Sequence, residues 1–241
     1  MSIPPTTPII QTSIASESVS GFLAHPDELR YRPGVLILHE GSGLTDFIKD
    51  QTRRLAAAGY TAFAPDLFRE PLRSRDHALA MIGLLVTDRH ELRRRTGEAL
   101  RWLQAIPHVD AQRTMAVGFC FGGLAALEMA RAGQDVKAVV CFHGGLSSRG
   151  LEQTPVTAKI LVCTGADDPF TPPDQCLAFQ EEMTRRRADW QMLVLSQTKH
   201  AFMNPAARPS VQTGCAYHAT SARRSWQAMQ ILLDEIMGNS L

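Results

Sequence analysis

The chain has 241 residues, which is enough for one large α/β domain with a full buried core. Its 25 Lys and Arg residues nearly balance its 24 Asp and Glu residues, so the formal net charge of +1 implies no field strong enough to hold nucleic acid or an anionic membrane. The five cysteines form no C-x-x-C pair, which argues against a disulfide framework and against a zinc site.

The start of the chain and its hydropathy bear on location. Residues 1–8 hold three prolines and are expected to form a disordered or extended tail before one domain over residues 9–241. No apolar run approaches the roughly 20 residues of a membrane span, and the first residues lack the basic and apolar regions of a signal peptide. We therefore expect a cytoplasmic protein without membrane or nucleic-acid partners, for which a homodimer would be unsurprising.

Two kinds of apolar run alternate along the chain. Short, continuous runs such as VLILH predict buried parallel strands, and longer runs with helical spacing predict helices. The expected strands are residues 9–15, 20–26, 35–39, 61–67, 114–119, 136–142, 158–165 and 191–196. The expected helices are residues 46–59, 75–105, 121–132, 172–188 and 216–237. The alternation predicts a mostly parallel, eight-stranded sheet with helices on both faces, and the lack of a helix between the first two strands disfavours a closed barrel.

A glycine-rich turn follows the expected strand 114–119. Gly118, Gly122 and Gly123 surround Cys120 with the spacing G-x-C-x-G-G, which is the nucleophile-elbow pattern G-x-S-x-G with sulfur in place of the hydroxyl. The same turn places Cys120 at a helix N-terminus, whose partial positive charge favours the thiolate. The alternative is that Cys120 is a small buried hydrophobe, so the choice depends on partners elsewhere in the chain.

Two later strand ends supply candidate partners. The strand that ends at Gly165 is followed by Asp167 and Asp168, of which Asp168 is expected to orient a histidine and Asp167 to cap a turn. His200 lies in the loop after the last strand, where a general base can reach a nucleophile on the middle strand. The chain order Cys120, Asp168, His200, with each residue after a strand, is that of the catalytic triads of α/β hydrolases.

The loop after the third expected strand supplies a fourth element. The backbone N–H groups of Gly41 and Phe121 are expected to form an oxyanion hole. Glu40 would lie close to Cys120, where a carboxylate raises the pKa of a thiol, so Glu40 could keep the resting sulfur protonated or hydrogen-bond it. The alternative role for Glu40 is that of a capping or salt-bridged loop residue, and His39 is expected to be structural.

These stretches together resemble the dienelactone hydrolase family of α/β hydrolases over most of the chain. The segments that match, in the family's order and at similar separations, are HEGSG, AAAGYTAFAPDLF, GFCFGG, GADDPFTPP and KHAF. Further segments, such as FHGGL and EEMTRRRADWQ, resemble a bacterial dienelactone-hydrolase-like branch. The resemblance implies an α/β-hydrolase fold with Cys120 as nucleophile, His200 as base, Asp168 as its orienter and Glu40 as the resting partner of the thiol.

One departure from the family pattern concerns the substrate. In the dienelactone enzymes proper, one arginine four residues beyond the triad histidine and another after the P-D-L-Y strand end grip the substrate carboxylate. Here Asn204 and Glu70 occupy those positions, with Arg69 and Arg73 nearby but out of register. An amide lacks the bidentate, charge-assisted grip of a guanidinium, worth roughly 1.5–3 kcal/mol, so anionic dienelactone is not the expected substrate.

The sequence thus predicts hydrolysis of activated carboxylic esters or lactones through a thioester, with no metal or cofactor. The substrate pocket is expected to include Arg69, Arg73, Phe202 and Asn204. Apolar residues near the predicted mouth would favour neutral, aromatic substrates, and they are Phe47, Phe68, Phe121, Leu146, Phe170 and Phe202. The alternatives are an aryl phosphotriester hydrolase that uses the same triad and a non-catalytic thiol redox sensor on the same fold.

Overall fold

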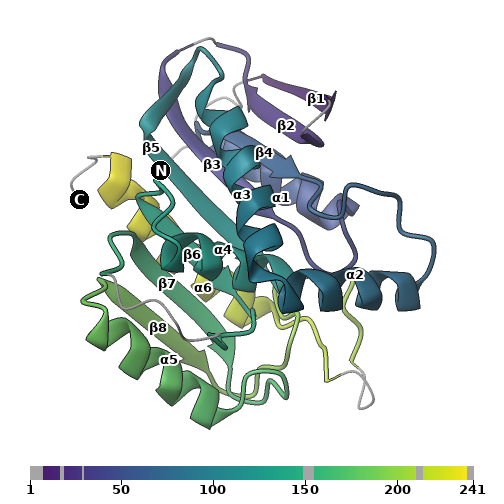
Figure 1. Cartoon of the computed structure of the whole chain (residues 1–241), viewed down its shortest axis with the longest axis vertical. Coiled ribbons are helices and arrows are strands. Elements are labelled where there is room, and N and C mark those ends of the chain that lie inside the picture. The colour runs from purple at the N-terminus through teal and green to yellow at the C-terminus, as the bar shows by residue number, and fades with distance from the viewer. Residues whose placement is uncertain (1–7, 17–18, 29, 149–154, 210–213, 238–241) are drawn as a thin grey trace.

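Eight strands form one sheet with the order β1-β2-β4-β3-β5-β6-β7-β8 (Figure 1). The computed structural model describes residues 8–16, 19–28, 30–148, 155–209 and 214–237, so the predicted tail lies outside the described residues apart from Pro8. The strands are β1 (Ile9–Ala15), β2 (Ser20–Pro26), β3 (Arg32–Leu38), β4 (Thr61–Pro65), β5 (Val109–Phe119), β6 (Ala138–Phe142), β7 (Lys159–Gly165) and β8 (Trp190–Leu195). The helices are α1 (Asp46–Ala57), α2 (Arg75–Thr87), α3 (Arg89–Gln104), α4 (Phe121–Arg131), α5 (Pro173–Arg185) and α6 (Ala219–Met237).

The sheet is parallel except at one edge. β1 pairs with β2 and β2 pairs with β4 in antiparallel fashion, whereas the pairs β3–β4, β3–β5, β5–β6, β6–β7 and β7–β8 are all parallel. The two strands without a helix between them pair directly, because antiparallel neighbours need only a short connection. The predicted eight-stranded, mostly parallel sheet is therefore confirmed.

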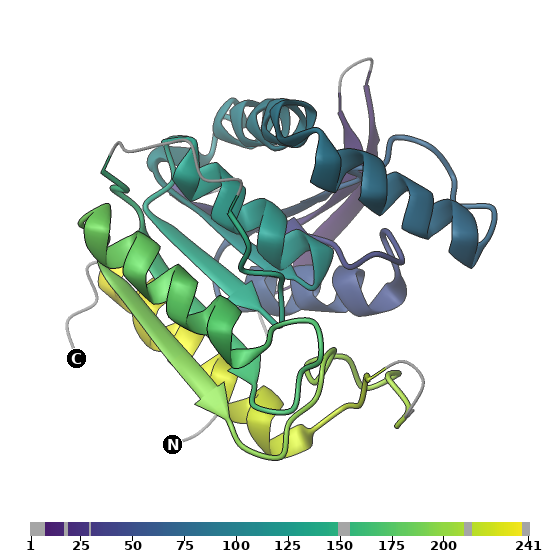
Figure 2. The same cartoon turned by 60° about the horizontal axis from the view of Figure 1, so that its bottom comes forward.

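Helices cover both faces of this sheet (Figures 1 and 2). Ile48 of α1 and Trp226 of α6 belong to one buried cluster, and Leu100 of α3, Leu124 of α4 and Phe179 of α5 belong to another on the other face. The apolar strands are thus buried on both sides, as expected for parallel strands that read as continuous apolar runs. This arrangement brings the carboxyl ends of the parallel strands together at one edge, where sites in such folds lie.

The predicted helix over residues 75–105 is wrong in one respect, because it is two helices. The helix is interrupted at Asp88, which ends α2 and caps α3. Its Oδ1 accepts a hydrogen bond from the Glu91 N–H at 3.0 Å. An aspartate at this position satisfies an amide that has no partner within the helix. Several boundaries also differ from the prediction, most of all at the starts of β3, β5 and α6, which lie at Arg32, Val109 and Ala219.

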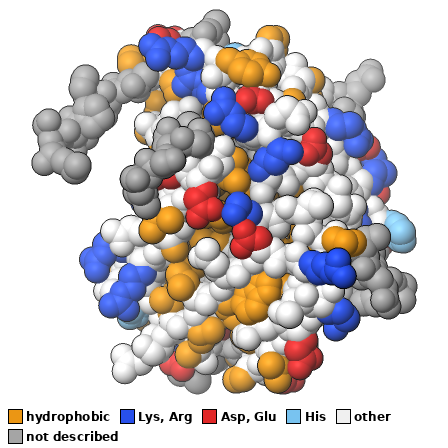
Figure 3. All heavy atoms as spheres, turned by 90° about the vertical axis from the view of Figure 1, so that its left-hand side faces the viewer, with side chains coloured by type: hydrophobic (Ala, Val, Ile, Leu, Met, Phe, Trp, Pro, Cys, Tyr) orange, Lys and Arg blue, Asp and Glu red, His pale blue; other side chains and the backbone are white. Residues whose placement is uncertain are grey.

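The surface carries charges of both signs. On the face drawn in Figure 3, Lys and Arg side chains are interspersed with Asp and Glu side chains. Such mixing follows from the nearly balanced composition and produces no long-range field of one sign on that face. Within the described ranges, no helix has both the length and the apolar composition needed to cross a membrane.

Candidate active site

Cys120 lies on a strained turn between β5 and α4. Its backbone has φ 53° and ψ −115°, a conformation that L-residues rarely adopt and that is typical of a nucleophile elbow. A Cβ at Gly118 would collide with the backbone of Gly122, and a Cβ at Gly122 would collide with the carbonyl of Leu38. Both glycines are therefore required for the turn, and the thiol is left partly exposed at the edge where β5 ends.

The structure brings the three predicted triad residues together. His200 Nε2 lies 3.2 Å from Cys120 Sγ, and His200 Nδ1 lies 2.8 Å from Asp168 Oδ2. The second carboxylate oxygen of Asp168 accepts a hydrogen bond from the Phe170 N–H at 2.9 Å, so both oxygens of this buried carboxylate have donors. The neighbouring Asp167 instead lies in the turn, where its N–H donates to the carbonyl of Thr198.

Backbone hydrogen bonds hold His200 in place. Its N–H donates to the carbonyl of Gly214 at 3.2 Å, and its carbonyl accepts from the N–H of Ala216 at 2.9 Å. Gly214 has φ +63°, and a Cβ there would collide with the ring of Pro169. The segment after β8 therefore braces both the histidine and the loop that carries the aspartate.

The electrostatics of His200 favour a proton on its ring. Burial by itself would lower the pKa of His200, but the hydrogen bonds with Asp168 and with the sulfur of Cys120 outweigh it and raise the pKa to about 10. Because Nδ1–H donates to the carboxylate, Nε2 is the atom that exchanges a proton with the thiol. A ring with such a raised pKa is a strong acceptor for a proton from the neighbouring sulfur.

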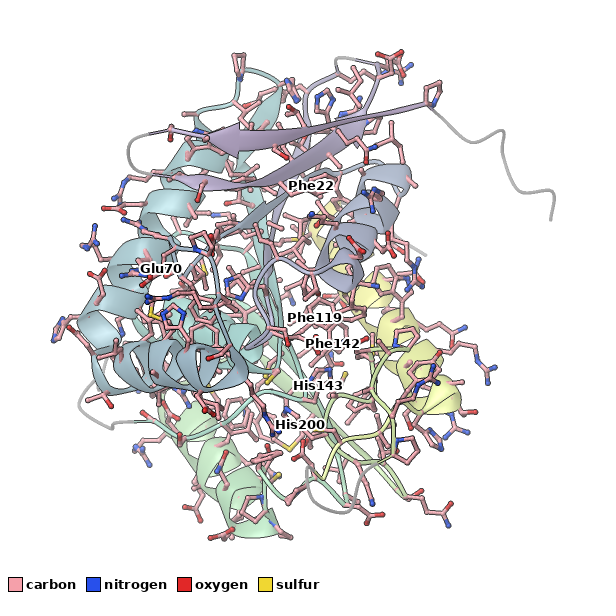
Figure 4. All side chains as sticks on the ribbon, turned by 90° about the vertical axis from the view of Figure 1, so that its right-hand side faces the viewer. Phe22, Glu70, Phe119, Phe142, His143 and His200 are labelled. Carbon is pink, nitrogen blue, oxygen red and sulfur yellow. The ribbon has the colours of Figure 1, made fainter. Side chains whose placement is uncertain are left out.

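His143 is a residue at this site that the sequence analysis did not single out. It follows β6 with φ 40° and has no exposed surface, and its ring centroid lies 5.2 Å from that of His200. Figure 4 shows the two rings as neighbours, with Phe119 and Phe142 close by. Burial, and then the charge of His200, hold the pKa of His143 well below its ordinary value, so a neutral ring packs against the candidate base. The only sequence signal was its place directly after a strand end.

Glu40 makes its hydrogen bond to Asn204. Asn204 Nδ2 donates to Glu40 Oε2 at 2.8 Å, and Asn204 Oδ1 accepts from the Ala206 N–H at 2.9 Å, which fixes the orientation of the amide. Burial raises the pKa of Glu40, and the Asn204 hydrogen bond and the charge of His200 act in the opposite direction. The carboxylate is thus held beside the base by an amide rather than hydrogen-bonded to the thiol.

His39 ties the loop that follows β3 to the loop that follows β4. The Leu67 N–H donates to His39 Nε2 at 3.0 Å, so Nδ1 carries the proton and donates to the carbonyl of Glu40 at 2.7 Å. The ring has no exposed surface, which agrees with the predicted structural role.

The two candidate oxyanion donors flank the elbow. Phe121 is the first residue of α4, where a backbone N–H has no partner within the helix. Gly41 follows β3, which pairs directly with β5 so that Leu38 lies opposite Gly118. The loop that holds Gly41 therefore runs next to the turn that holds Cys120.

The structure does not bring the other predicted pocket residues to the triad. Arg69 forms an ion pair with Glu98 of α3, and the exposed Arg73 lies next to Glu70. Figure 4 shows Glu70 apart from His143 and His200. The described residues also include no group of three or more His, Cys, Asp or Glu side chains that could hold a metal ion.

The prediction that Phe202 lines the pocket is wrong. Its side chain has no exposed surface, and its ring packs against His143 at a centroid distance of 5.2 Å. The apolar ring is more stable in the core behind the site than it would be in contact with water.

Comparisons with known sequences place this site in a wider context. The model of the dienelactone hydrolase family matches residues 19–237. A Yersinia pestis protein whose proposed activity is carboxymethylenebutenolidase is 30% identical, with 91% of this chain and 85% of the relative covered. An Escherichia coli K12 protein with the same proposed activity is 31% identical, with 82% and 74% covered.

Solved structures of hydrolases also match this chain. The crystal structure of a dienelactone hydrolase-like promiscuous phosphotriesterase from metagenomic libraries has a TM-score of 0.89 and 35% identity, and the match covers 95% of this chain and 98% of that one. A deep-sea metagenomic α/β hydrolase superposes with a TM-score of 0.70 at 17% identity over 96% of this chain and 99% of that one. The latter likeness shows the α/β-hydrolase fold alone.

Proposed function

The chain belongs to the dienelactone hydrolase family and is an ester hydrolase of that type, and from this premise we propose that it cleaves activated carboxylic esters and lactones through Cys120, His200 and Asp168. The observation that carries the proposal is the position of one imidazole, with Nε2 at 3.2 Å from the thiol and Nδ1 at 2.8 Å from a buried carboxylate. A base held in this way can take the thiol proton, while the carboxylate stabilises the imidazolium that forms.

The proposed reaction has two halves. His200 accepts the proton of Cys120, the sulfur attacks the ester carbonyl, and the amides of Gly41 and Phe121 stabilise the oxyanion. The C–O bond then breaks, and His200 gives its proton to the departing oxygen, which leaves a thioester on Cys120. In the second half His200 takes a proton from water, the hydroxide attacks the thioester carbonyl, and the sulfur leaves as thiolate with the acid as product.

The chemistry of the thiolate narrows the substrate class. Sulfur is itself a good leaving group, so the tetrahedral intermediate proceeds to the thioester only when the oxygen leaving group is comparably good. Enol esters, aryl esters and strained or conjugated lactones satisfy this condition, whereas ordinary alkyl esters and amides do not. We therefore propose activated esters and lactones as the substrates.

The charges near the site favour neutral substrates. Glu40 lies next to His200 and is held by an uncharged amide, that of Asn204. An anionic substrate at the triad would therefore meet the carboxyl group of Glu40 and an uncharged amide rather than a guanidinium.

A second candidate activity is hydrolysis of aryl phosphotriesters. One observation favours it, namely the solved structure at 35% identity whose name describes a promiscuous phosphotriesterase. In that reaction the sulfur of Cys120 would attack phosphorus, the aryl oxide would leave with the proton of His200, and water would cleave the S–P bond.

One assay tests the proposal. Wild type, Cys120→Ala and His200→Gln are given p-nitrophenyl acetate, an anionic dienelactone and an aryl phosphotriester side by side. We expect a burst and turnover with the neutral aryl ester that both variants lose. Turnover that persists in both variants would contradict the proposed mechanism, and the absence of any turnover that depends on Cys120 would favour the thiol redox sensor. Preference for the anionic lactone would contradict the proposed role of Asn204.

Three further expectations remain proposals. They are a single domain over residues 9–241, a cytoplasmic location and assembly as a homodimer. All five cysteines are free thiols, which supports a reducing compartment. Limited proteolysis, cell fractionation and light scattering would check the three in turn.

A further inference from the structure

Two aromatic rings, those of His143 and Phe170, pack against His200 in addition to its hydrogen-bond partners. His143 is fully buried, and Phe170 is 53% exposed, with its ring centroid 4.8 Å from that of His200 and an interplanar angle of 71°. Other aromatic side chains near the triad are hidden, since Phe121 is 4% exposed and Phe119 has no exposed surface. Phe170 is therefore the aromatic ring in contact with His200 that a molecule arriving from solvent can touch.

The backbone on both sides of this ring is fixed. The Phe170 N–H donates to Asp168 Oδ1 at 2.9 Å, which ties the residue to the triad carboxylate. The preceding Pro169 packs against Gly214 so closely that a Cβ at Gly214 would collide with it. The aromatic ring is thus held next to His200 by the same loop that positions the acid, although about half of its surface is open to water.

The geometry of the proposed reaction places the leaving group of the substrate next to the ring of Phe170. His200 Nε2 must come within hydrogen-bond distance of the ester oxygen to give it a proton, so the leaving group lies on the side of the thiol where the imidazole is. The carbonyl oxygen, by contrast, points to the amides of Gly41 and Phe121. A leaving group attached to that ester oxygen is therefore next to the ring that packs on His200.

We propose that the exposed face of Phe170 is the subsite for the leaving group and that it selects aryl leaving groups. The inference rests on the proposed ester hydrolysis. It goes further by stating that the alcohol released from the substrate is a phenol. An aryl ring can pack on Phe170 in an offset or edge-to-face arrangement, which is worth more than area burial alone. A small alkyl leaving group gains none of this contact, so the ring raises kcat/KM for aryl esters specifically.

The test uses two esters with the same acyl group, phenyl acetate and 2,2,2-trifluoroethyl acetate. Both form the same acetyl thioester on Cys120, so they differ only in the leaving group. We expect Phe170→Ala to lower kcat/KM about tenfold for phenyl acetate and less than threefold for trifluoroethyl acetate, which is the size of effect known for aromatic pairs. Phe170→Leu, which keeps an apolar side chain and disturbs the loop less, should show the same preference at a smaller size.

The control is Leu177→Ala, which removes a similarly exposed apolar side chain, 57% exposed, from α5. It should change neither rate constant. The rate of deacylation should also be unchanged in both Phe170 variants, because the phenol has left before that step.

Two outcomes would overturn the inference. An equal fall for both esters, with a shifted pH profile, would show that Phe170 only shields or positions His200. Equal activity of wild type and Phe170→Ala on both esters would place the leaving group elsewhere. Either result leaves the proposed function intact as long as turnover depends on Cys120, whereas turnover of wild type that does not depend on Cys120 would contradict the proposed function itself.

Discussion

Among the residues that the structure describes, two clusters of buried charged side chains differ in how their charges are paired. One cluster, here called the Arg131 cluster, lies between helices: Arg131 of α4 donates to both carboxylate oxygens of Glu182 at 3.0 and 2.7 Å and to Glu128 at 3.1 Å. Arg93 and Arg186 donate to the same two glutamates. Each carboxylate in this cluster is therefore paired with two guanidinium groups.

The second cluster is the triad, and it ends in an atom that can react. Asp168 is saturated by His200 and a backbone amide, but His200 leads on to the partly exposed thiol of Cys120. In the Arg131 cluster the carboxylates are bound by guanidinium groups and no nucleophile is present, whereas the triad ends at a thiol that lies 3.2 Å from the imidazole. A buried charge cluster thus points to catalysis when its chain of hydrogen bonds ends at a nucleophile.

The largest expected effect comes from removing that nucleophile. Cys120→Ala should lower kcat for p-nitrophenyl acetate by about 10⁴-fold or more, because residues that act as a unit lose most of their effect when one is removed. Thermal unfolding should stay close to wild type, since no buried charge loses its only partner. A large loss of stability would show that the sulfur supports the fold rather than the reaction.

Asp168→Asn should come next, with a loss in kcat of up to about 10⁴-fold. The hydrogen bond with Asp168 raises the pKa of His200, so the variant should lower that pKa and make the ring a weaker acceptor for the proton of the thiol. The rate of alkylation of Cys120 by iodoacetamide, measured against pH, reads this change directly. Alkylation that follows the wild-type pH profile would mean that the carboxylate does not control the base.

Arg131→Met tests the other cluster. It should destabilise the fold by about 3–4 kcal/mol, because Glu182 loses its bidentate partner in a buried position, yet kcat/KM at a temperature well below unfolding should change less than threefold. Urea unfolding measures the first quantity and ester hydrolysis the second. The matched control is Arg94→Met, whose partners Glu91 and Glu98 lie on the surface and whose loss should cost only about 0–1 kcal/mol.

The smallest expected effect concerns Asn204. Burial raises the pKa of Glu40 above its unfolded value, so the carboxyl stabilises the fold below the unfolded pKa and this stability is lost as the pH rises through the folded pKa. The Asn204 hydrogen bond opposes that shift, so Asn204→Ala should raise the pKa further and enlarge the loss. The difference in unfolding free energy between pH 5 and pH 8 should therefore grow, and adding Glu40→Gln to the same variant should abolish the growth.

The triad could be predicted from sequence because each member follows a strand within a short local motif. Gly118 and Gly122 mark the elbow for steric reasons that act over a few residues, and the same holds for the loop of Asp168. The burial of Phe202 and the packing of His143 on His200 could not be predicted, because they depend on segments 59 residues apart in the chain, from residue 143 to residue 202, that meet only in the fold. The hydrogen bond between Glu40 and Asn204 could not be predicted for the same reason, since these residues are also far apart in the chain.

Most of the fold could be predicted for a related reason, since buried parallel strands leave a strong apolar signal. The break between α2 and α3 was not predicted, because apolar residues continue at helical spacing on both sides of it. The local signal was present: Asp88 followed three residues later by Glu91 is the spacing of a helix N-terminus. A capping signal inside a long helical pattern therefore indicates a second helix.

The groups of the proposed triad are also divided between the two halves of the polypeptide, with Cys120 after β5 and its partners after β7 and β8. Gly133 lies between them in an exposed turn with φ +66°, just past the end of α4 that is remote from the elbow. Fragments cut there would each lack a group that the proposed reaction needs. The release of a coloured phenol after mixing the two fragments would then measure how far they reassemble into an active protein.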